Sequence, residues 1–265
     1  MVMEHPNWLE YTEYKRFPIN QYRIKPIITG VQRLSKESSK KRLKILEIGC
    51  GKGNITIPLG SLGHEVLGID YHDESLATAR KNNPFKPVRF IKGDVKKFLV
   101  KTGKGLSRYD AVVACEILEH LNAPENIIGL LGKHGKKGVR FFITVPNGYS
   151  YWEGIGYFLH RLRRTKGIKD VYFWVRRAVG KKDPCTEYDE DIHVNWFTFG
   201  RLRKMLENAG FRVVRSENLF VFYNPIQCFL PFLKVPDRLL RAELKLTNVM
   251  PHAMVNGWFV ECVKD

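Results

Sequence analysis

The amino-acid sequence predicts an α/β fold built on one doubly wound, mainly parallel sheet. Apolar strand-like runs alternate with helix-length segments from residue 44 onward, which is the pattern of consecutive βαβ units. The run 44–48 leads into a turn with glycines at positions 49, 51 and 53, and the next strand ends in Asp70. Ligands of such sheets bind at the carboxyl ends of the strands, so these two ends predict a nucleoside-binding site.

Short runs of β-branched and other apolar residues predict seven strands, and apolar residues at helical spacing predict five helices. The strands are expected at 44–48, 65–69, 87–91, 109–114, 139–145, 211–215 and 255–262, and the helices at 22–34, 53–62, 73–82, 124–133 and 198–210. Asn54, Asp73 and Thr198 stand where helix N-caps are expected. A final strand reached by a hairpin would lie antiparallel in the otherwise parallel sheet.

The length of 265 residues fits one domain with room for an insertion. We expect an N-terminal cap segment at 1–43, a core domain formed by 44–147 and 191–265, and an inserted basic, aromatic lid at 148–190. No run of eighteen apolar residues and no hydrophobic N-terminal signal is present, which predicts a cytoplasmic protein. The five cysteines have no paired spacing and are expected to be reduced thiols.

The charge is strongly positive, +17 at pH 7 with a pI of about 9.7. Such a charge favours anionic partners at long range, such as nucleic acid or an acidic membrane surface. It is concentrated in two segments: residues 1–44 carry ten Lys and Arg against four acidic residues, and residues 151–182 carry nine against two. RNA and an anionic membrane are therefore both candidate partners.

The glycine turn itself narrows the choice of cofactor. Its spacing is Gly-x-Gly-x-Gly, and an acidic residue, Glu47, lies in the strand before it. A dinucleotide site needs Gly-x-Gly-x-x-Gly and would be disfavoured by a carboxylate near the pyrophosphate. A nicotinamide dehydrogenase is therefore the weakest alternative. Leu-Glu-Ile-Gly-Cys-Gly-Lys-Gly, residues 46–53, resembles instead the first motif of the class I S-adenosylmethionine-dependent methyltransferases, which have a Rossmann-like seven-stranded sheet.

The resemblance implies a set of residues that bind S-adenosylmethionine. Glycines of the turn would hold the amino-acid and sugar parts, Asp70 the ribose, and Asp94 with the next backbone N–H the adenine. In the related ubiquinone-biosynthesis O-methyltransferases an arginine before the first motif reaches the cofactor carboxylate, and Arg23 occupies a similar segment. The implied cofactor-binding residues are Arg23, Glu47, Gly49, Gly51, Gly53, Asp70, Tyr71, Asp94, Val95 and Cys115.

A second segment predicts the acceptor side of the site. The apolar strand 109–114 continues into Cys115-Glu116-Ile-Leu-Glu119-His120, and in a helical turn the spacings of three and four would put Glu116, Glu119 and His120 on one face. Ubiquinone-type O-methyltransferases and small-RNA 2′-O-methyltransferases carry a similar Glu-x-x-Glu-His segment beside the acceptor. The resemblance implies His120 as the base, with His193 and Glu119 as further catalytic candidates; a purely structural role for these side chains is the alternative.

The same two carboxylates and two imidazoles, Glu116, Glu119, His120 and His193, could hold a divalent ion such as Mg²⁺, as in metal-dependent relatives. The expected reaction is O-methylation of a small or lipid-like acceptor. RNA methylation and a non-catalytic cofactor-binding scaffold remain alternatives.

Residues 148–182 alternate aromatic clusters with arginines. That composition is typical of an interfacial helix on anionic lipid, and it also suits an ordinary lid or stacked RNA bases. We expect this lid to select the acceptor and to contact a membrane peripherally.

Overall fold

The structure is a computed structural model that describes residues 8–12, 18–151, 194–219 and 236–265. Its centre is a seven-stranded sheet with the order β3-β2-β1-β4-β5-β7-β6. The strands are β1 (Lys44–Ile48), β2 (Glu65–Asp70), β3 (Val88–Lys92), β4 (Ala111–Cys115), β5 (Arg140–Pro146), β6 (Phe211–Leu219) and β7 (Gly257–Lys264).

Only β7 runs antiparallel, paired with β5 on one side and β6 on the other. The predicted doubly wound sheet with a single antiparallel strand is therefore confirmed. The first five strands begin and end within two residues of their expected bounds, while β6 extends four residues further than predicted. The carboxyl ends of β1, β2, β4, β5 and β6 share one edge of the sheet with the start of β7.

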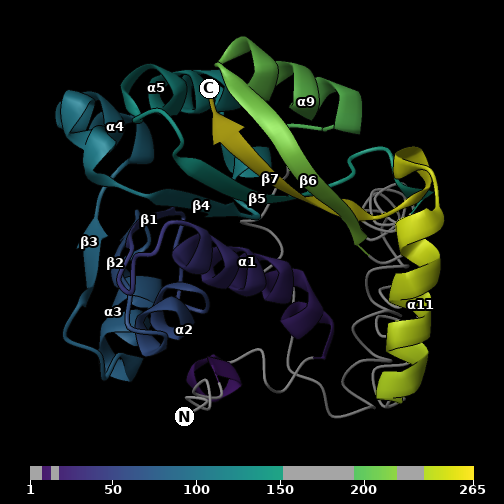
Figure 1. The fold of residues 1–265 in the computed structure, drawn as a ribbon, viewed down its shortest axis with the longest axis horizontal. Coiled ribbons are helices and arrows are strands. Elements are labelled where there is room, and N and C mark those ends of the chain that lie inside the picture. Colours follow the sequence, from purple (N-terminus) through teal and green to yellow (C-terminus); the bar gives the residue numbers. More distant parts are fainter. Residues whose placement is uncertain (1–7, 13–17, 152–193, 220–235) are drawn as a thin grey trace, which may run out of the picture.

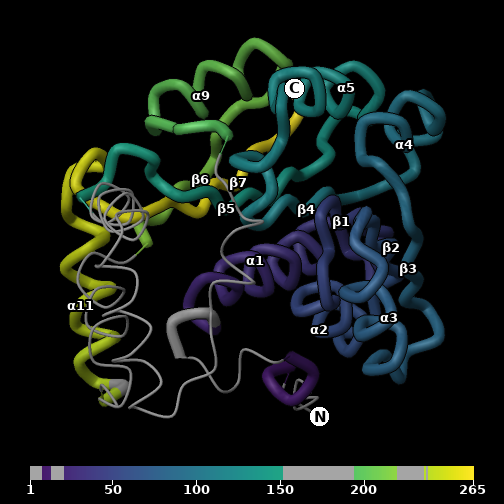
Figure 2. The backbone as a smooth tube through the Cα atoms, turned by 180° about the vertical axis from the view of Figure 1, so that it is seen from behind, coloured from purple at the N-terminus to yellow at the C-terminus, as the bar shows by residue number. Residues whose placement is uncertain are grey.

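Helices cover both faces of the sheet (Figures 1 and 2). One face carries the first three α-helices and the other carries α4, α5 and α9, while α11 lies beside the end of β6. Their bounds are α1 (Pro18–Glu37), α2 (Thr56–Ser61), α3 (Asp73–Asn82), α4 (Val95–Thr102), α5 (Pro124–His134), α9 (Phe199–Asn208) and α11 (Asp237–Val249), with short 3₁₀ turns at Trp8–Tyr11, Gly103–Arg108, Leu118–His120 and His252–Met254.

All five predicted helices are confirmed, but only one of the three predicted N-caps is. Thr198 caps α9, its hydroxyl accepting from the Arg201 N–H at 3.2 Å. Asn54 is wrong as a cap, because α2 begins two residues later and follows Ile55, which makes no side-chain cap bond. Asp73 is the first residue of α3, and the cap is His72 before it, whose imidazole accepts from the Ser75 N–H. The helices α4 and α11 were not predicted.

The core consists of two apolar layers separated by the sheet. Alternate residues of β5 and β7 point to opposite faces: Phe141 and Trp258 pack with α5 and α9, and Phe142 and Phe259 pack with α1. All four side chains are essentially inaccessible to water, and burying an aromatic side chain contributes roughly 1.5–3 kcal/mol. The alternation typical of strands thus produces both layers.

Helix α1 is also held by charge. Glu261 of β7 is buried, and its carboxylate accepts from Arg33 of α1 and from Arg140 of β5, the latter at 3.3 Å. Arg140 reaches Glu37 at the end of α1 at 3.0 Å. Because a buried carboxylate is costly unless it is paired, this cluster fixes the helix against the sheet.

The proposed lid at 148–190 lies almost entirely outside the described residues, which include only Gly148–Tyr151 of it. Its structure and its boundaries stay predictions. Among the described residues, none of the helices has the length and apolar character needed to cross a membrane.

Two glycines of α5 give a matched test of the packing between α5 and α9. A Cβ added at Gly132 would lie 2.0 Å from the Ala209 carbonyl oxygen, whereas one at Gly129 would meet no atom within 4 Å. We expect Gly132→Ala to lower the free energy of unfolding by about 1–3 kcal/mol through overpacking. Gly129→Ala should raise it by roughly 0.5–1 kcal/mol through helix propensity. Urea denaturation measures both, and equal effects would contradict the close approach of the two helices.

Candidate functional site

The site begins with the turn that follows β1. Gly49, Gly51 and Gly53 have φ values of 70°, 48° and 78°, a region that L side chains rarely adopt. A Cβ at Gly49 would also lie 2.7 Å from the Ile117 side chain. At Gly51 a Cβ would meet nothing within 4 Å, so this part of the turn faces open space. The turn is therefore packed below and open above, as a cradle for a ligand requires.

Asp70 ties this turn to the end of β2. One carboxylate oxygen accepts from the Gly51 N–H at 2.7 Å, and the other accepts from the His72 N–H at 2.9 Å. The N–H groups of Gly49 and Cys50 donate to the Ile69 carbonyl at 2.8 and 3.1 Å. Asp70 is thus placed beside the open side of the glycine turn, where the sequence predicted the ribose carboxylate.

Glu47 lies beneath the turn with its side chain buried, and it accepts a hydrogen bond from the Thr56 hydroxyl. Burial raises the pKa of Glu47 to about 8; the charge of Asp70 adds to the rise, and the bond from Thr56 opposes it. At pH 7 the carboxyl is largely protonated in the absence of a nearby cation. Its observed contact links β1 to the start of α2, and direct cofactor binding by Glu47 stays a prediction.

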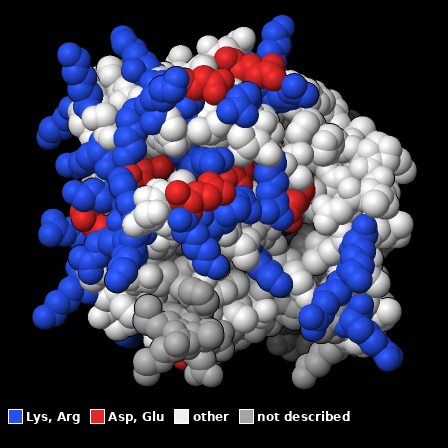
Figure 3. Space-filling view, in the orientation of Figure 1, with Lys and Arg blue, Asp and Glu red and all other residues white. Residues whose placement is uncertain are grey.

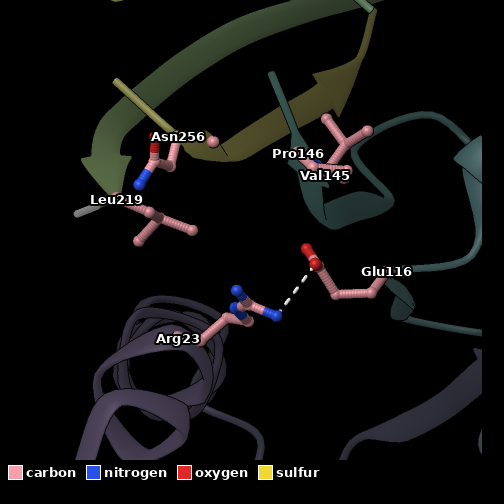
Figure 4. Close-up of a pocket in the computed structure, with 7 residues that line it drawn as sticks. Arg23, Glu116, Val145, Pro146, Leu219 and Asn256 are labelled. Carbon is pink, nitrogen blue, oxygen red and sulfur yellow. Dashed lines mark hydrogen bonds and ion pairs between the residues drawn. The ribbon is translucent and has the colours of Figure 1, made fainter. Parts of the chain in front are cut away.

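Arg23 of α1 reaches the end of β4, where its guanidinium donates to Glu116 at 2.9 Å. Figure 4 shows the two side chains pointing toward one another across a pocket that Val145, Leu219 and Asn256 also line. The cavity there is about 10 Å³, little more than the space of one water. The structure thus brings Arg23 to the strand-end edge, as predicted, with Glu116 as its partner.

The expected helical turn carrying Glu116, Glu119 and His120 on one face is wrong. Glu116 has a φ of 51°, and only Leu118–His120 form a single 3₁₀ turn. The left-handed backbone of Glu116 interrupts a right-handed helical path after β4; Glu116 pairs with Arg23 of α1, whereas Glu119 is buried. The spacing argument failed because it assumed a continuous right-handed helix.

Glu119 and His120 do lie together. An oxygen of the Glu119 carboxyl is 3.8 Å from His120 Nε2, and the His120 side chain is about a quarter exposed. His193 lies outside the described residues, but the chain directly after it runs along the same turn. The N–H groups of Val194 and Asn195 donate to the Glu119 carbonyl at 2.9 and 3.0 Å. His120 is thus the accessible base candidate, with a carboxyl beside it.

The remaining predicted cofactor residues occupy the same edge. Cys115 ends β4 and accepts from the Thr144 hydroxyl at 2.9 Å, and burial raises the pKa of its thiol well above the ordinary value. Asp94 caps α4 by accepting from the Lys97 N–H at 2.7 Å, followed by the buried Val95. Tyr71 is exposed directly after Asp70. Their contacts with a cofactor stay predictions.

These groups fit a nucleoside that carries a cation. The turn offers open space at Gly51, Asp70 supplies carboxylate oxygens beside it, and the partly exposed carboxylate of Glu116 follows the end of β4. A third glycine at the dinucleotide position is missing. Within the described ranges, no three His, Cys, Asp or Glu side chains are grouped to hold a metal ion; the predicted four-ligand set includes His193, which is outside those ranges.

Comparison with known families decides the assignment. A family described as a methyltransferase domain matches residues 19–216 of this chain, which is most of its length and includes the glycine turn. The chain belongs to this methyltransferase family.

Curated relatives of this methyltransferase domain include the mitochondrial ubiquinone biosynthesis O-methyltransferase of Rattus norvegicus. It is 38% identical over 107 residues, which are 40% of this chain and 31% of the relative. The ubiquinone biosynthesis O-methyltransferase of Proteus mirabilis is 31% identical over 140 residues, 50% of this chain and 55% of the relative. The alignments thus span about a third to a half of these relatives.

Solved structures show the same fold. A SAM-dependent methyltransferase from Archaeoglobus fulgidus has a TM-score of 0.54 at 17% identity, with 89% of this chain and 94% of that one covered. Magnesium protoporphyrin IX methyltransferase from Synechocystis, solved with bound SAH, has a TM-score of 0.55 at 15% identity, with 93% and 83% covered. The Rossmann-like sheet predicted from the sequence is therefore that of SAM-dependent methyltransferases.

Sequence reasoning missed three features of this edge. It did not foresee that Glu116 pairs with Arg23, because the two residues are 93 positions apart. It treated Asp94 only as an adenine ligand and missed its role as the N-cap of α4. Val95, Phe98 and Leu99 follow Asp94 at helical spacing, which is a signal that could have predicted this helix. It also did not select His252, which has no motif around it in the sequence but lines a cavity at this edge of the sheet.

The buried carboxyl of Glu47 gives a pH-dependent test. A glutamate in the unfolded chain ionises near its ordinary pKa of 4.5, whereas folded Glu47 holds its proton to about pH 8. Its contribution to stability is therefore fully present below pH 4.5 and is lost as the pH rises to 8, at about 1.4 kcal/mol per pKa unit. Glu47→Gln should be insensitive to this titration while keeping an acceptor for Thr56. Urea denaturation from pH 5 to 8 should show wild type losing stability relative to the variant; parallel curves would refute the raised pKa.

Proposed function

We propose that this protein transfers a methyl group from S-adenosylmethionine to a hydroxyl of a small or lipid-like acceptor. The observation that carries the proposal is the glycine turn of β1, held by Asp70 with its Gly51 side open, in a chain of the methyltransferase family. When bound, S-adenosylmethionine supplies an activated methyl group on a positively charged sulfur.

The residues of the chain have separate tasks in this proposal. Asp70 accepts hydrogen bonds from ribose hydroxyls, and Arg23 offers its guanidinium to the cofactor carboxylate. The Arg23 to Glu116 pair keeps both charges compensated at the end of β4 when no other partner is present. Because methyl transfer needs mainly proximity and orientation, holding the cofactor rigidly is the main contribution of the sheet edge.

His120 accepts the proton of the acceptor hydroxyl. Its imidazole is partly exposed at the strand-end edge, and the Glu119 carboxyl beside it can stabilise the protonated ring. His193 is the second candidate, supported by the anchoring of the following residues on Glu119. A divalent ion such as Mg²⁺ at these side chains stays a prediction with no support among the described residues.

The names of the curated relatives support a lipid-like acceptor, because those proteins are named for ubiquinone biosynthesis. The composition of residues 148–182 supports peripheral contact with an anionic membrane. If this membrane contact exists, the protein should co-sediment with phosphatidylglycerol vesicles at low salt. A protein that stays in the supernatant would refute the contact. The cytoplasmic location stays a prediction from the sequence.

RNA methylation is a second candidate, favoured by a basic surface. Lys and Arg side chains crowd one side of the molecule over β3 and α4 (Figure 3). Residues 80–108 hold ten basic residues and one acidic residue, Asp94. Phosphates would be attracted to such a surface, but the described residues there include no exposed aromatic ring on which a base could stack. Label from S-adenosylmethionine recovered in RNA, and not in an organic extract, would favour this second function.

Asp70→Ala tests the cofactor site. Loss of hydrogen bonds to a carboxylate, each worth roughly 1.5–3 kcal/mol, should weaken S-adenosylhomocysteine binding at least about tenfold. Asp73→Ala is the matched control, because Asp73 lies three residues on and pairs with Lys92 at the surface. Calorimetry that shows equal affinity for both variants, or a preference of the wild type for NAD, would overturn the assignment.

His120→Gln tests the base. We expect the rate of label transfer to the acceptor to fall at least about 100-fold, as is typical when a general base is removed, with S-adenosylhomocysteine affinity unchanged. His134→Gln, at the end of α5, is the control. The same assay in EDTA tests the metal: full activity there would exclude a required Mg²⁺. An unchanged rate in His120→Gln would leave His193 as the base to examine.

A further inference from the structure

A second cavity lies at the carboxyl edge of the sheet, apart from the glycine turn and from the Arg23 to Glu116 pocket. Its volume is about 340 Å³, within the range of small-molecule sites. It is formed where β5 ends, α9 begins and β7 starts, and its walls include Tyr149, Phe199, His252 and Trp258. Half of the residues that line the cavity thus carry aromatic rings.

The aromatic wall is preassembled by contacts among its own members. The rings of Phe199 and His252 stack with centroids 3.8 Å apart, and Phe199 meets Trp258 edge to face at 5.7 Å. The Trp258 indole N–H donates to the His252 carbonyl at 3.1 Å. These contacts fix the rings, so a ligand would not have to order them on binding.

The tautomer of His252 follows from its neighbour Asn218. The Asn218 amide nitrogen donates to the carbonyls of Thr247 and Met250 at 2.9 and 2.8 Å, so the other amide atom is the oxygen. This oxygen is 2.6 Å from His252 Nδ1, which must therefore carry a proton and donate. Burial lowers the pKa of His252, which favours the neutral ring with Nε2 as an unprotonated acceptor.

Two other polar side chains of the wall, Asn147 and Thr198, make hydrogen bonds within the protein. The Asn147 amide is used by the Tyr149 N–H and by the carbonyls of Ala253 and Val255. The Thr198 hydroxyl accepts from Arg201 in capping α9. His252 Nε2 and the exposed Tyr149 hydroxyl are consequently the side-chain acceptors that the described wall offers to a ligand, and Nε2 is the one that belongs to the stacked rings of Phe199 and His252.

The cavity is also connected to the proposed acceptor side. Val194 and Asn195 are bonded to Glu119, and Trp196, next along this segment, meets Tyr149 of the cavity edge to face at 5.8 Å. The Gly148 N–H donates to the Phe197 carbonyl at 3.1 Å. The segment 194–197 thus lies between the His120 turn and the cavity.

We propose that this cavity binds an apolar, ring-shaped ligand that carries a hydroxyl, such as a phenol, with the hydroxyl donating to His252 Nε2. The rings of the wall suit an aromatic ligand, and the His252 acceptor fixed among them selects compounds with a hydrogen-bond donor over plain hydrocarbons. Insofar as the ligand is the methyl acceptor, the proposal rests on the proposed function; the binding itself does not require it.

Binding of two probes, 4-propylphenol and propylbenzene, tests the proposal by calorimetry or ligand-observed NMR without cofactor. The wild type is compared with three variants, His252→Phe, Gly200→Leu and Gly129→Leu. Gly200 lines the cavity, and a Cβ there would meet nothing within 4 Å. Leucine should therefore fill the space without disturbing α9. Gly129→Leu adds the same side chain at an equally open helical position outside the cavity.

The wild type should bind the phenol about fivefold or more tighter than propylbenzene, as one neutral hydrogen bond predicts. His252→Phe should abolish that preference while keeping a ring against Phe199. Gly200→Leu should weaken both probes at least about tenfold, with Gly129→Leu unchanged. No phenol binding by the wild type, or unchanged phenol binding by Gly200→Leu, would overturn the proposal. S-adenosylhomocysteine affinity and thermal unfolding of each variant check the fold, and loss of methyl transfer alone would count only against the proposed function.

Discussion

The carboxylate of Asp70 is the interaction on which the site depends. It receives N–H groups from the glycine turn of β1 and from the residue that caps α3, so one side chain joins the ends of two strands and the start of a helix. The N–H groups of Gly49 and Cys50 donate to the Ile69 carbonyl, whereas the Gly51 N–H donates to Asp70 and without that carboxylate would have to be satisfied by water. The turn is therefore pre-shaped, and ligand binding does not have to organise it.

How much was predictable depended on whether the signal was local. The strands flanking the turn, the turn itself and the carboxylate of Asp70 follow from adjacent residues, because strand period and glycine spacing are properties of short segments. Glu116 shows the limit: its left-handed conformation is uncommon for a side chain with a Cβ, and it is accompanied by a bond to Arg23 from a distant helix. A spacing rule cannot contain that contact.

The cavity near His252 also could not be predicted from local sequence patterns. Phe199, Trp258 and Asn218 come from two strands and a helix that are distant in sequence, and only the pairing of β7 between β5 and β6 brings them together. The sequence shows a single histidine in an unremarkable segment. The tautomer of His252 is set by Asn218, which is fixed by backbone carbonyls at the end of α11. This helix was not predicted, because the segment that precedes it contains several prolines.

Two ion pairs connect α1 to the strands that form the site. The C-terminal half of α1 is held by the ion pair between Arg33 and the buried Glu261. In its N-terminal half, Arg23 forms an ion pair with Glu116. Glu261 of the first pair is buried, and leaving its carboxylate unpaired would be costly. Both side chains of the second pair are about a quarter exposed, and such pairs contribute little net stability. Loss of the contact between Arg23 and Glu116 should therefore leave the helix in place. An anion that arrives at the end of β4 would find a cation already positioned, and the carboxylate of Glu116 would be released at the mouth of the site.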